Sequence, residues 1–423
     1  LGGSPLYLDM AAGLYTRLGL HDRAMPLYRR ATQLQPEIDQ FRANLAASLV
    51  YVGDIEEAVS LYESLIEKYP AHQRNHYELS KLRKATDRSH VDRMIDVLHT
   101  GRLPPDKNIF LYYAIGKELE DLEAWHEAFS YYERAGNAIT ALANYDVGRD
   151  VELIDAVIDT CTAEWLGDAQ ARAATPAGSP EPIFVTGLPR SGTTLAERII
   201  SSHSTVESVD ETFFVPIALQ RVSALASPDG VTPKIVRTAA RKDPARVASD
   251  YIASVSYKLT GKPRFVEKLP ENFTWLGFVA KAFPHARLII LNRNPMDVCF
   301  AMYKQSFFRF AYNQADLARY YIAFDRLKAH WREVLGSRLV EIDYELLVSD
   351  QETRTRRLLD ELDLPFEQAC LDFDQNERPS STASTVQVRS KVHTQSVQRW
   401  RHFESELAPL AAALTAAGID IGA

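Results

Sequence analysis

Apolar positions in the first 172 residues recur with two periods, the 3.6-residue period of a helix and a longer period of 34 residues. The residues that match across the longer period are Gly19 and Gly53, Ala24 and Ala58, Leu27 and Leu61, Tyr28 and Tyr62, and Pro36 and Pro70. A looser copy occupies residues 111–137, and the segments 74–100 and 138–172 are helical in pattern. We therefore predict stacked helical hairpins that bury their apolar faces against one another, forming an α-solenoid over residues 1–172.

A 34-residue unit with small residues at the helix crossings resembles the tetratricopeptide repeat. The groove of such a solenoid commonly holds a peptide, but the helices can equally serve only to brace the rest of the chain. The aromatic residues do not decide between these roles, because they fit either the core or the groove: Tyr15, Tyr28, Tyr62, Tyr131 and Tyr132.

The pattern changes after residues 173–181, which are rich in Ala, Pro, Gly and Ser and are predicted to be a linker. Short apolar runs that indicate strands then alternate with helical segments. The runs lie at 183–185, 264–268, 288–291 and 338–343, and the run at 288–291 is apolar throughout, as in an interior parallel strand. We predict a P-loop-like, three-layer α/β domain with a mainly parallel sheet over residues 182–423.

The turn after the first of these strands has the composition of a phosphate cradle. Gly187 and Gly192 have the spacing of a P-loop, but Thr193 stands where that motif has a lysine. The missing lysine argues against nucleoside triphosphate chemistry and therefore against a P-loop kinase. Arg190 supplies a cation instead. The groups expected to hold a 5′-phosphate are the backbone amides and side chains of Ser191, Gly192, Thr193 and Thr194.

The segment PRSGTTL, at 189–195, resembles the loop of sulfotransferases that use 3′-phosphoadenosine 5′-phosphosulfate (PAPS). Within that superfamily the chain is similar to the tyrosylprotein sulfotransferases and to bacterial sulfotransferases fused to tetratricopeptide repeats. The resemblance runs from about residue 182 to residue 410. It implies transfer of a sulfuryl group from PAPS, as co-substrate, to an acceptor hydroxyl, without a metal. The acceptor is a peptide or protein tyrosine, or the hydroxyl of a small molecule or glycan.

The resemblance also implies catalytic roles. Glu211, in a Glu-Thr pair, corresponds to the general base, with Asp210 as its adjacent competitor. Lys268 ends a predicted strand and corresponds to the lysine that holds the transferring group and its bridging oxygen. Arg190 and Ser384 are expected to stabilise the oxygens of that group.

Other residues correspond to the donor-binding positions of the family. Arg293 ends a predicted strand and is assigned to the 3′-phosphate, whereas Tyr344, Ser384 and Arg399 are assigned to further donor contacts. This 3′-phosphate site departs from the family: Ala301 stands where a Ser is usual, and Lys304 and Gln305 stand where a second Arg is expected. Nearby cations that supplement the site in this interpretation are Arg389 and Lys391.

Composition restricts the remaining choices. The net charge of −8 argues against a nucleic-acid partner. The three cysteines are far apart without metal-ligand spacing, which favours free thiols in a reducing cytoplasm. We see no apolar run long enough for a membrane span and no signal peptide. A homodimer is left open. The non-enzymatic alternative is an interaction protein with a degenerate catalytic half, for which Ala301 is the best support.

Overall fold

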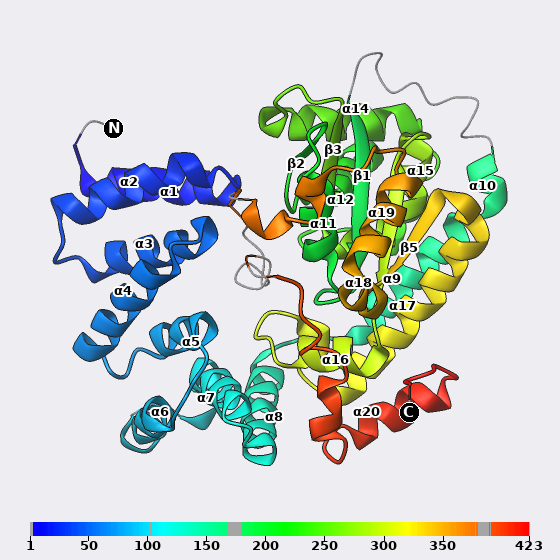
Figure 1. Cartoon of the computed structure of the whole chain (residues 1–423). Helices are drawn as coiled ribbons and strands as arrows, with labels where there is room; N and C mark the ends of the chain where they lie inside the picture. Colours follow the sequence, from blue (N-terminus) through cyan, green and yellow to red (C-terminus); the bar gives the residue numbers. More distant parts are fainter. Residues whose placement is uncertain are drawn as a thin grey trace.

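The computed structural model describes residues 3–101, 104–167, 180–376, 378–379, 389 and 391–422. In its first half, the helices between residues 5 and 142 follow one another in an arc around one side of the molecule, whereas those between residues 147 and 167 lie on the opposite side (Figure 1). These helices are α1 (Pro5–Arg17), α2 (His21–Leu34), α3 (Asp39–Val52), α4 (Ile55–Lys68), α5 (Gln73–Leu82), α6 (Ser89–Thr100), α7 (Ile109–Asp121), α8 (Trp125–Leu142), α9 (Val147–Thr160) and α10 (Ala163–Gly167).

The 34-residue period reappears in the geometry of the first two hairpins. Gly19 and Gly53 both lie between the helices of a hairpin and adopt positive φ angles of 70° and 96°, which favour glycine. Ala24 and Ala58 are both fully buried where the helices cross. The repeat half therefore has the tetratricopeptide-like organisation that the sequence predicts. Four of the five weighed aromatic residues belong to its buried core, namely Tyr28, Tyr62, Tyr131 and Tyr132.

The second half is built on a five-stranded sheet. Its strands are β1 (Glu181–Gly187), β2 (Val206–Ser208), β3 (Arg264–Lys268), β4 (Arg287–Asn292) and β5 (Leu339–Asp343). Their order is β2-β3-β1-β4-β5 and every pairing is parallel, so the predicted α/β class is confirmed. Because β1 begins at Glu181, the last residue of the predicted linker belongs to the sheet. Residues 168–179 lie outside the described part of the chain.

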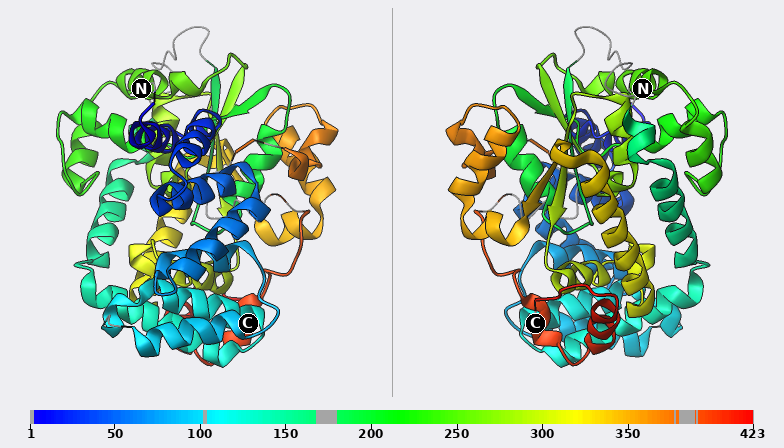
Figure 2. Two further views of the ribbon diagram at one scale, coloured as in Figure 1. Left: turned by 90° about the vertical axis from the view of Figure 1, so that its left-hand side faces the viewer. Right: turned by 90° about the vertical axis from the view of Figure 1, so that its right-hand side faces the viewer.

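Helices cover both faces of this sheet (Figure 2). Ile183 and Val185 of β1 face one apolar layer with α11 and α19, whereas Phe184 faces the opposite layer with α14, α15 and α17. This alternation follows from the period of two along a strand. The helices are α11 (Thr193–Ser201), α12 (Phe214–Ser223), α13 (Pro233–Ala239), α14 (Pro244–Val255), α15 (Leu276–Ala282), α16 (Pro295–Tyr303), α17 (Gln314–Leu335), α18 (Tyr344–Ser349), α19 (Gln351–Glu361) and α20 (Ala408–Ala416).

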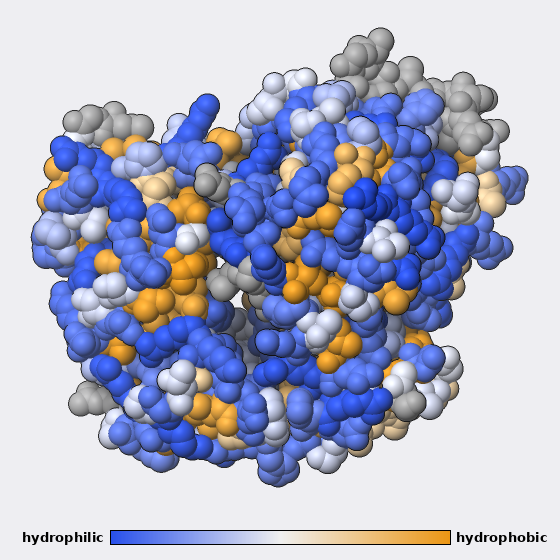
Figure 3. Space-filling model, viewed as in Figure 1, coloured by the Kyte–Doolittle hydropathy of each residue, from blue (hydrophilic) through white to orange (hydrophobic). Residues whose placement is uncertain are grey.

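The two halves touch at both ends of the arc. At one end, Phe129 of α8 stacks on Tyr303 of α16 with 5.7 Å between ring centroids, within a continuous apolar core. At the other end, the Tyr257 hydroxyl donates to the carbonyl of Leu18, 3.1 Å away. Between these contacts the molecular surface is hollowed (Figure 3). None of the described helices has the length and apolar character needed to cross a membrane.

Candidate active site

The turn between β1 and α11 is held in a conformation that its glycines permit. Gly187 and Gly192 have φ angles of 145° and 101°, and Arg190 between them also has a positive φ of 69°. A side chain at Gly192 would collide with the ring of Tyr344, which packs on the turn. The Ser191 hydroxyl is buried and has no hydrogen-bond partner among the described residues. The turn thus offers a buried donor and the first amides of α11 to an anion.

Arg293, at the end of β4, fixes this turn from the side. Its Nη1 donates to the carbonyl of Arg190 at 2.6 Å, and its Nη2 donates to the carbonyl of Ser396 at 2.8 Å. The guanidinium lies 4.6 Å from the ring centroid of Tyr344, whose hydroxyl is 2.8 Å from the Ser396 hydroxyl. Burial and then the charge of Arg293 lower the pKa of Arg190 to about 10. Two arginines therefore converge on the same turn at the carboxyl edge of the sheet.

A lysine and a carboxylate pair at the end of β3. The Lys268 ammonium forms an ion pair with Glu211. The lysine side chain is 1% exposed, whereas the glutamate side chain is 30% exposed. Asp210, the competing acid, lies 3.5 Å from Lys258 and borders a separate, smaller hollow. Of the two neighbouring acids, only Glu211 borders the large cavity that also contains Arg190.

A second carboxyl group, Glu267, supports this loop from the opposite side of β3. It is fully buried and accepts hydrogen bonds at 2.5 Å from the hydroxyls of Thr212 and Tyr251. Burial raises the pKa of Glu267 to about 7. Because Thr212 directly follows Glu211, this buried network positions the loop that carries the candidate base. Sequence reasoning missed Glu267, although an acid inside an apolar strand is a recognisable signal.

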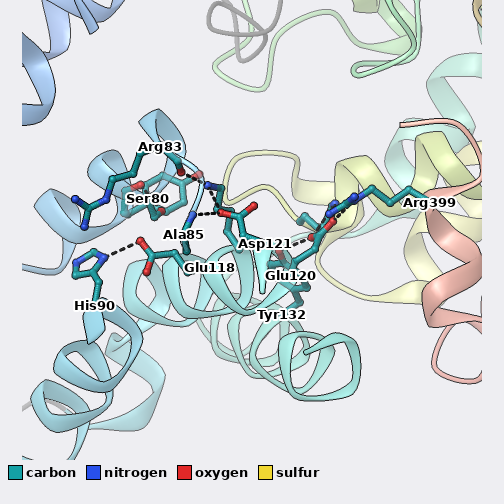
Figure 4. Close-up of polar contacts among 12 residues, drawn as sticks. Ser80, Arg83, Ala85, His90, Glu118, Glu120, Asp121, Tyr132 and Arg399 are labelled. Atoms are coloured by element: carbon teal, nitrogen blue, oxygen red, sulfur yellow. Dashed lines mark hydrogen bonds and ion pairs between the residues drawn. The ribbon is translucent and has the colours of Figure 1, made fainter. Parts of the chain in front are cut away.

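The same cavity contains another charged cluster. Lys304, which follows α16, contacts both oxygens of Glu120 at 2.8 and 2.9 Å, and the Nε of Arg399 donates to Glu120 at 2.6 Å (Figure 4). Glu120 lies on α7 of the repeat half. Burial alone would raise its pKa, but the two cations bring the pKa of Glu120 down to about 2.

Comparisons with known proteins address the same region. Residues 182–368 match the family model described as Sulfotransferase family. These residues form a sulfotransferase-family domain.

Relatives of the domain extend the comparison. The chain is 29% identical over 399 residues to an uncharacterized protein of Aquifex aeolicus (strain VF5), covering 92% of this chain and 52% of that protein. It is 25% identical over 238 residues to a putative protein-tyrosine sulfotransferase of Caenorhabditis briggsae, covering 52% of this chain and 80% of the relative. The protein-tyrosine sulfotransferase of Drosophila melanogaster is 25% identical over 235 residues, covering 52% of this chain and 46% of the relative. The chain thus spans about half the length of the Aquifex and Drosophila relatives.

Solved structures give weaker likenesses. The sulfotransferase domain of the Synechococcus PCC 7002 olefin synthase is 19% identical, with a TM-score of 0.39. The match covers 54% of this chain and 91% of that structure's chain. The sulfotransferase domain from the curacin biosynthetic pathway is 17% identical, also with a TM-score of 0.39. That match covers 56% of this chain and 98% of the other chain.

Most predicted site residues of the sulfotransferase domain meet around one cavity of about 1370 Å³ between the two halves. Ser191, Thr193 and Lys268 are buried next to this lining. Ser384 lies outside the described residues, so its predicted role stays a prediction. The predicted residues that line the cavity are Arg190, Gly192, Thr194, Glu211, Arg293, Tyr344 and Arg399.

One sequence-based interpretation is wrong. Arg389 does not join the 3′-phosphate site, because its Nη2 donates to the carbonyl of Tyr51 at 3.0 Å and the guanidinium lies against Gly53. The carbonyl groups at the end of α3 attract this cation to the repeat half. Lys391 does line the cavity. The sequence reasoning also missed Ser396 and Glu120. The sequence did carry a signal for Glu120: its spacing places this acidic residue on the same helix face as Tyr113 and Gly116.

Proposed function

We propose that the chain is a sulfotransferase that moves a sulfuryl group from PAPS to an acceptor hydroxyl. The observation that carries this proposal is the meeting, around one cavity, of an anion cradle without the P-loop lysine, two arginines, and a lysine paired with a carboxylate. The family match of residues 182–368 supports it. The donor supplies an activated sulfuryl group, and the residues of this chain bind it, orient it and move the proton.

The residues present fit a donor with a phosphate at each end of its ribose. The buried Ser191 hydroxyl and the amides that begin α11 suit the 5′-phosphosulfate, with Arg190 beside them. The Nε of Arg293 is buried and has no partner among the described residues, so it has hydrogen-bonding capacity left for the 3′-phosphate. The Arg293 guanidinium lies over the Tyr344 ring, 4.6 Å from its centroid.

Glu211 and Lys268 divide the chemical work in this proposal. The acceptor oxygen forms a bond to sulfur while the bond from sulfur to the phosphate oxygen breaks. Glu211 takes the acceptor proton, and Lys268 neutralises the charge that develops on the leaving phosphate. We expect Lys268 to exchange Glu211 for donor oxygens when the donor binds, which frees the carboxylate to act as a base.

The size of the cavity favours a large acceptor. Pockets for small ligands span roughly 300–1,000 Å³, whereas this cavity of about 1370 Å³ includes the proposed donor site and extends beyond it, from Arg190 to Tyr69 and Lys81 of the repeat half. We propose a tyrosine of a peptide or protein as the acceptor, in line with the names of the Caenorhabditis and Drosophila relatives. The repeat half would then hold the segments that flank the tyrosine.

Calorimetry with 3′-phosphoadenosine 5′-phosphate, in the absence of Mg²⁺, tests the donor. We expect micromolar binding, and Arg293→Ala should weaken it about 100-fold while changing the affinity for 5′-AMP only a few-fold. Arg389→Ala is the matched control and should leave the ratio of the two affinities unchanged. Absence of binding, or binding only of ATP with Mg²⁺, would overturn the proposal. Labelled PAPS with tyrosine peptides, compared with phenols and glycans, then tests the acceptor.

A further inference from the structure

Glu120 is a repeat-half residue inside the predicted donor end of the cavity. It lies on α7, and its carboxylate contacts Lys304 and Arg399, which are more than 180 residues away in the sequence. Both cations line the cavity together with Arg190 and Arg293. The two halves thus share one charged cluster.

The contacts of Glu120 are those of a fixed group. One oxygen accepts from Tyr132 of α8 at 2.8 Å and from Lys304 at 2.9 Å, and the other accepts from Lys304 at 2.8 Å and from Arg399 at 2.6 Å. The Glu120 side chain is 6% exposed, whereas those of Lys304 and Arg399 are 18% and 32% exposed. All three residues line the cavity, and the carboxylate is the least exposed of them. Figure 4 shows Glu120 and Arg399 facing each other.

We propose that Glu120 is a positioning residue of the donor site, which fixes Lys304 and Arg399 toward the anionic donor and makes donor binding depend on the repeat half. The inference rests on the proposed function. The resemblance places Lys304 and Gln305 where a second arginine is expected at the 3′-phosphate motif. In this proposal Lys304 and Arg399 supply the positive charge there.

The physical reason is the crowding of like charges. The charged groups that face Lys304 are Glu120 from α7, Arg399, and Arg190 from the turn after β1. Burial lowers the pKa of Lys304, and the charges of Arg399 and Arg190 lower it further, whereas Glu120 opposes them. Without Glu120, we expect Lys304 to release its proton more readily and Arg399 to lose its fixed orientation.

The test is the variant Glu120→Gln in the full chain, titrated with 3′-phosphoadenosine 5′-phosphate at pH 7 and pH 9. We expect binding about tenfold weaker at pH 7, and a further loss at pH 9 that exceeds any change in the parent chain. The matched control is Glu118→Gln, two residues away on α7 and also buried, but bonded to His90 instead. It should lower the melting temperature while changing the affinity less than twofold.

A double-mutant cycle shows whether Glu120 acts through its partner. Lys304→Met should weaken binding, and adding Glu120→Gln to it should cost little more. Should Glu120→Gln fail to fold, Glu120→Asp keeps the charge but shortens the reach; it should weaken binding without adding pH dependence. Unchanged affinity in Glu120→Gln would overturn the inference alone, and tighter binding would show that the carboxylate competes with the donor. A parent chain that binds no nucleotide would overturn the proposed function as well.

Discussion

Both halves of the chain bury ionisable side chains, but with different partners. In the repeat half, His76 and His90 are bonded to each other at 2.8 Å, and His90 is bonded to Glu118 at 2.6 Å. None of these three lines the large cavity. In the α/β half, Glu211 and Lys268 pair at the end of a strand, beside that cavity. Burial in the repeat half therefore serves packing, whereas burial at the strand ends keeps charged groups ready for a ligand.

The histidine chain is a group of buried polar side chains that are bonded to one another within the repeat half. His76 Nε2 lies 2.7 Å from the carbonyl of Pro70, so it carries a proton, and His76 Nδ1 must accept from His90 Nε2. His90 Nδ1 then faces Glu118 Oε1 at 2.6 Å. Glu120, two residues further along the same helix, bonds instead to Lys304 and Arg399 of the other half.

The largest expected effect is at Glu211. The comparison of the two halves predicts that replacing this residue removes catalytic activity without changing the fold. Glu211→Gln should lower the turnover of labelled PAPS by about 10²- to 10⁴-fold, because the acceptor proton has no base. The melting temperature and the affinity for 3′-phosphoadenosine 5′-phosphate should stay near those of the parent chain. Asp210→Asn, one residue away, is the control and should retain most activity. Equal losses in the two variants, or lost nucleotide binding in Glu211→Gln, would remove the base assignment.

Local pattern was enough to predict most elements of both halves, but it missed the short edge strand β2. The run at 288–291 falls inside β4, the helical period from Thr193 begins α11, and the residues before the glycine turn form β1. These elements were predictable because the burial pattern and the type of turn depend on residues that are neighbours in the sequence. The cradle was predictable for the same reason, since Gly187 to Thr194 form one continuous motif.

Contacts between distant segments were not predictable in this way. Nothing near Glu120 in the sequence indicates that its partners are Lys304 and Arg399, and nothing near Arg389 shows that the end of α3 will attract it. Such contacts depend on how the two halves close on each other, which is a property of their packing and not of any local period.

An intermediate effect is expected at Glu267, which belongs to the α/β half but faces its core. Burial raises its pKa from 4.5 to about 7, so the folded state holds the proton more tightly than the unfolded state. The contribution of Glu267 to the free energy of unfolding is on the order of 3 kcal/mol. It is complete below pH 4.5 and is lost as the pH rises through 7. Glu267→Gln keeps a neutral side chain and should flatten this part of the profile. The measurement is the melting temperature from pH 4.5 to 8.5; an unchanged slope would contradict the prediction.

The smallest effect is expected at His76 in the repeat half, and its sign is opposite. Burial lowers the pKa of His76 from 6.5 to about 4, so the unfolded state binds the proton more tightly. The contribution of His76 to the free energy of unfolding is complete above pH 6.5 and is lost as the pH falls through 4. His76→Gln should make the melting temperature less sensitive to acid between pH 6.5 and 4, whereas His72→Gln, at an exposed position just before α5, should not. If the melting temperature of His76→Gln remains as sensitive to acid as that of the parent chain, this sensitivity does not arise from His76. The predicted contrast with Glu267 would then be wrong.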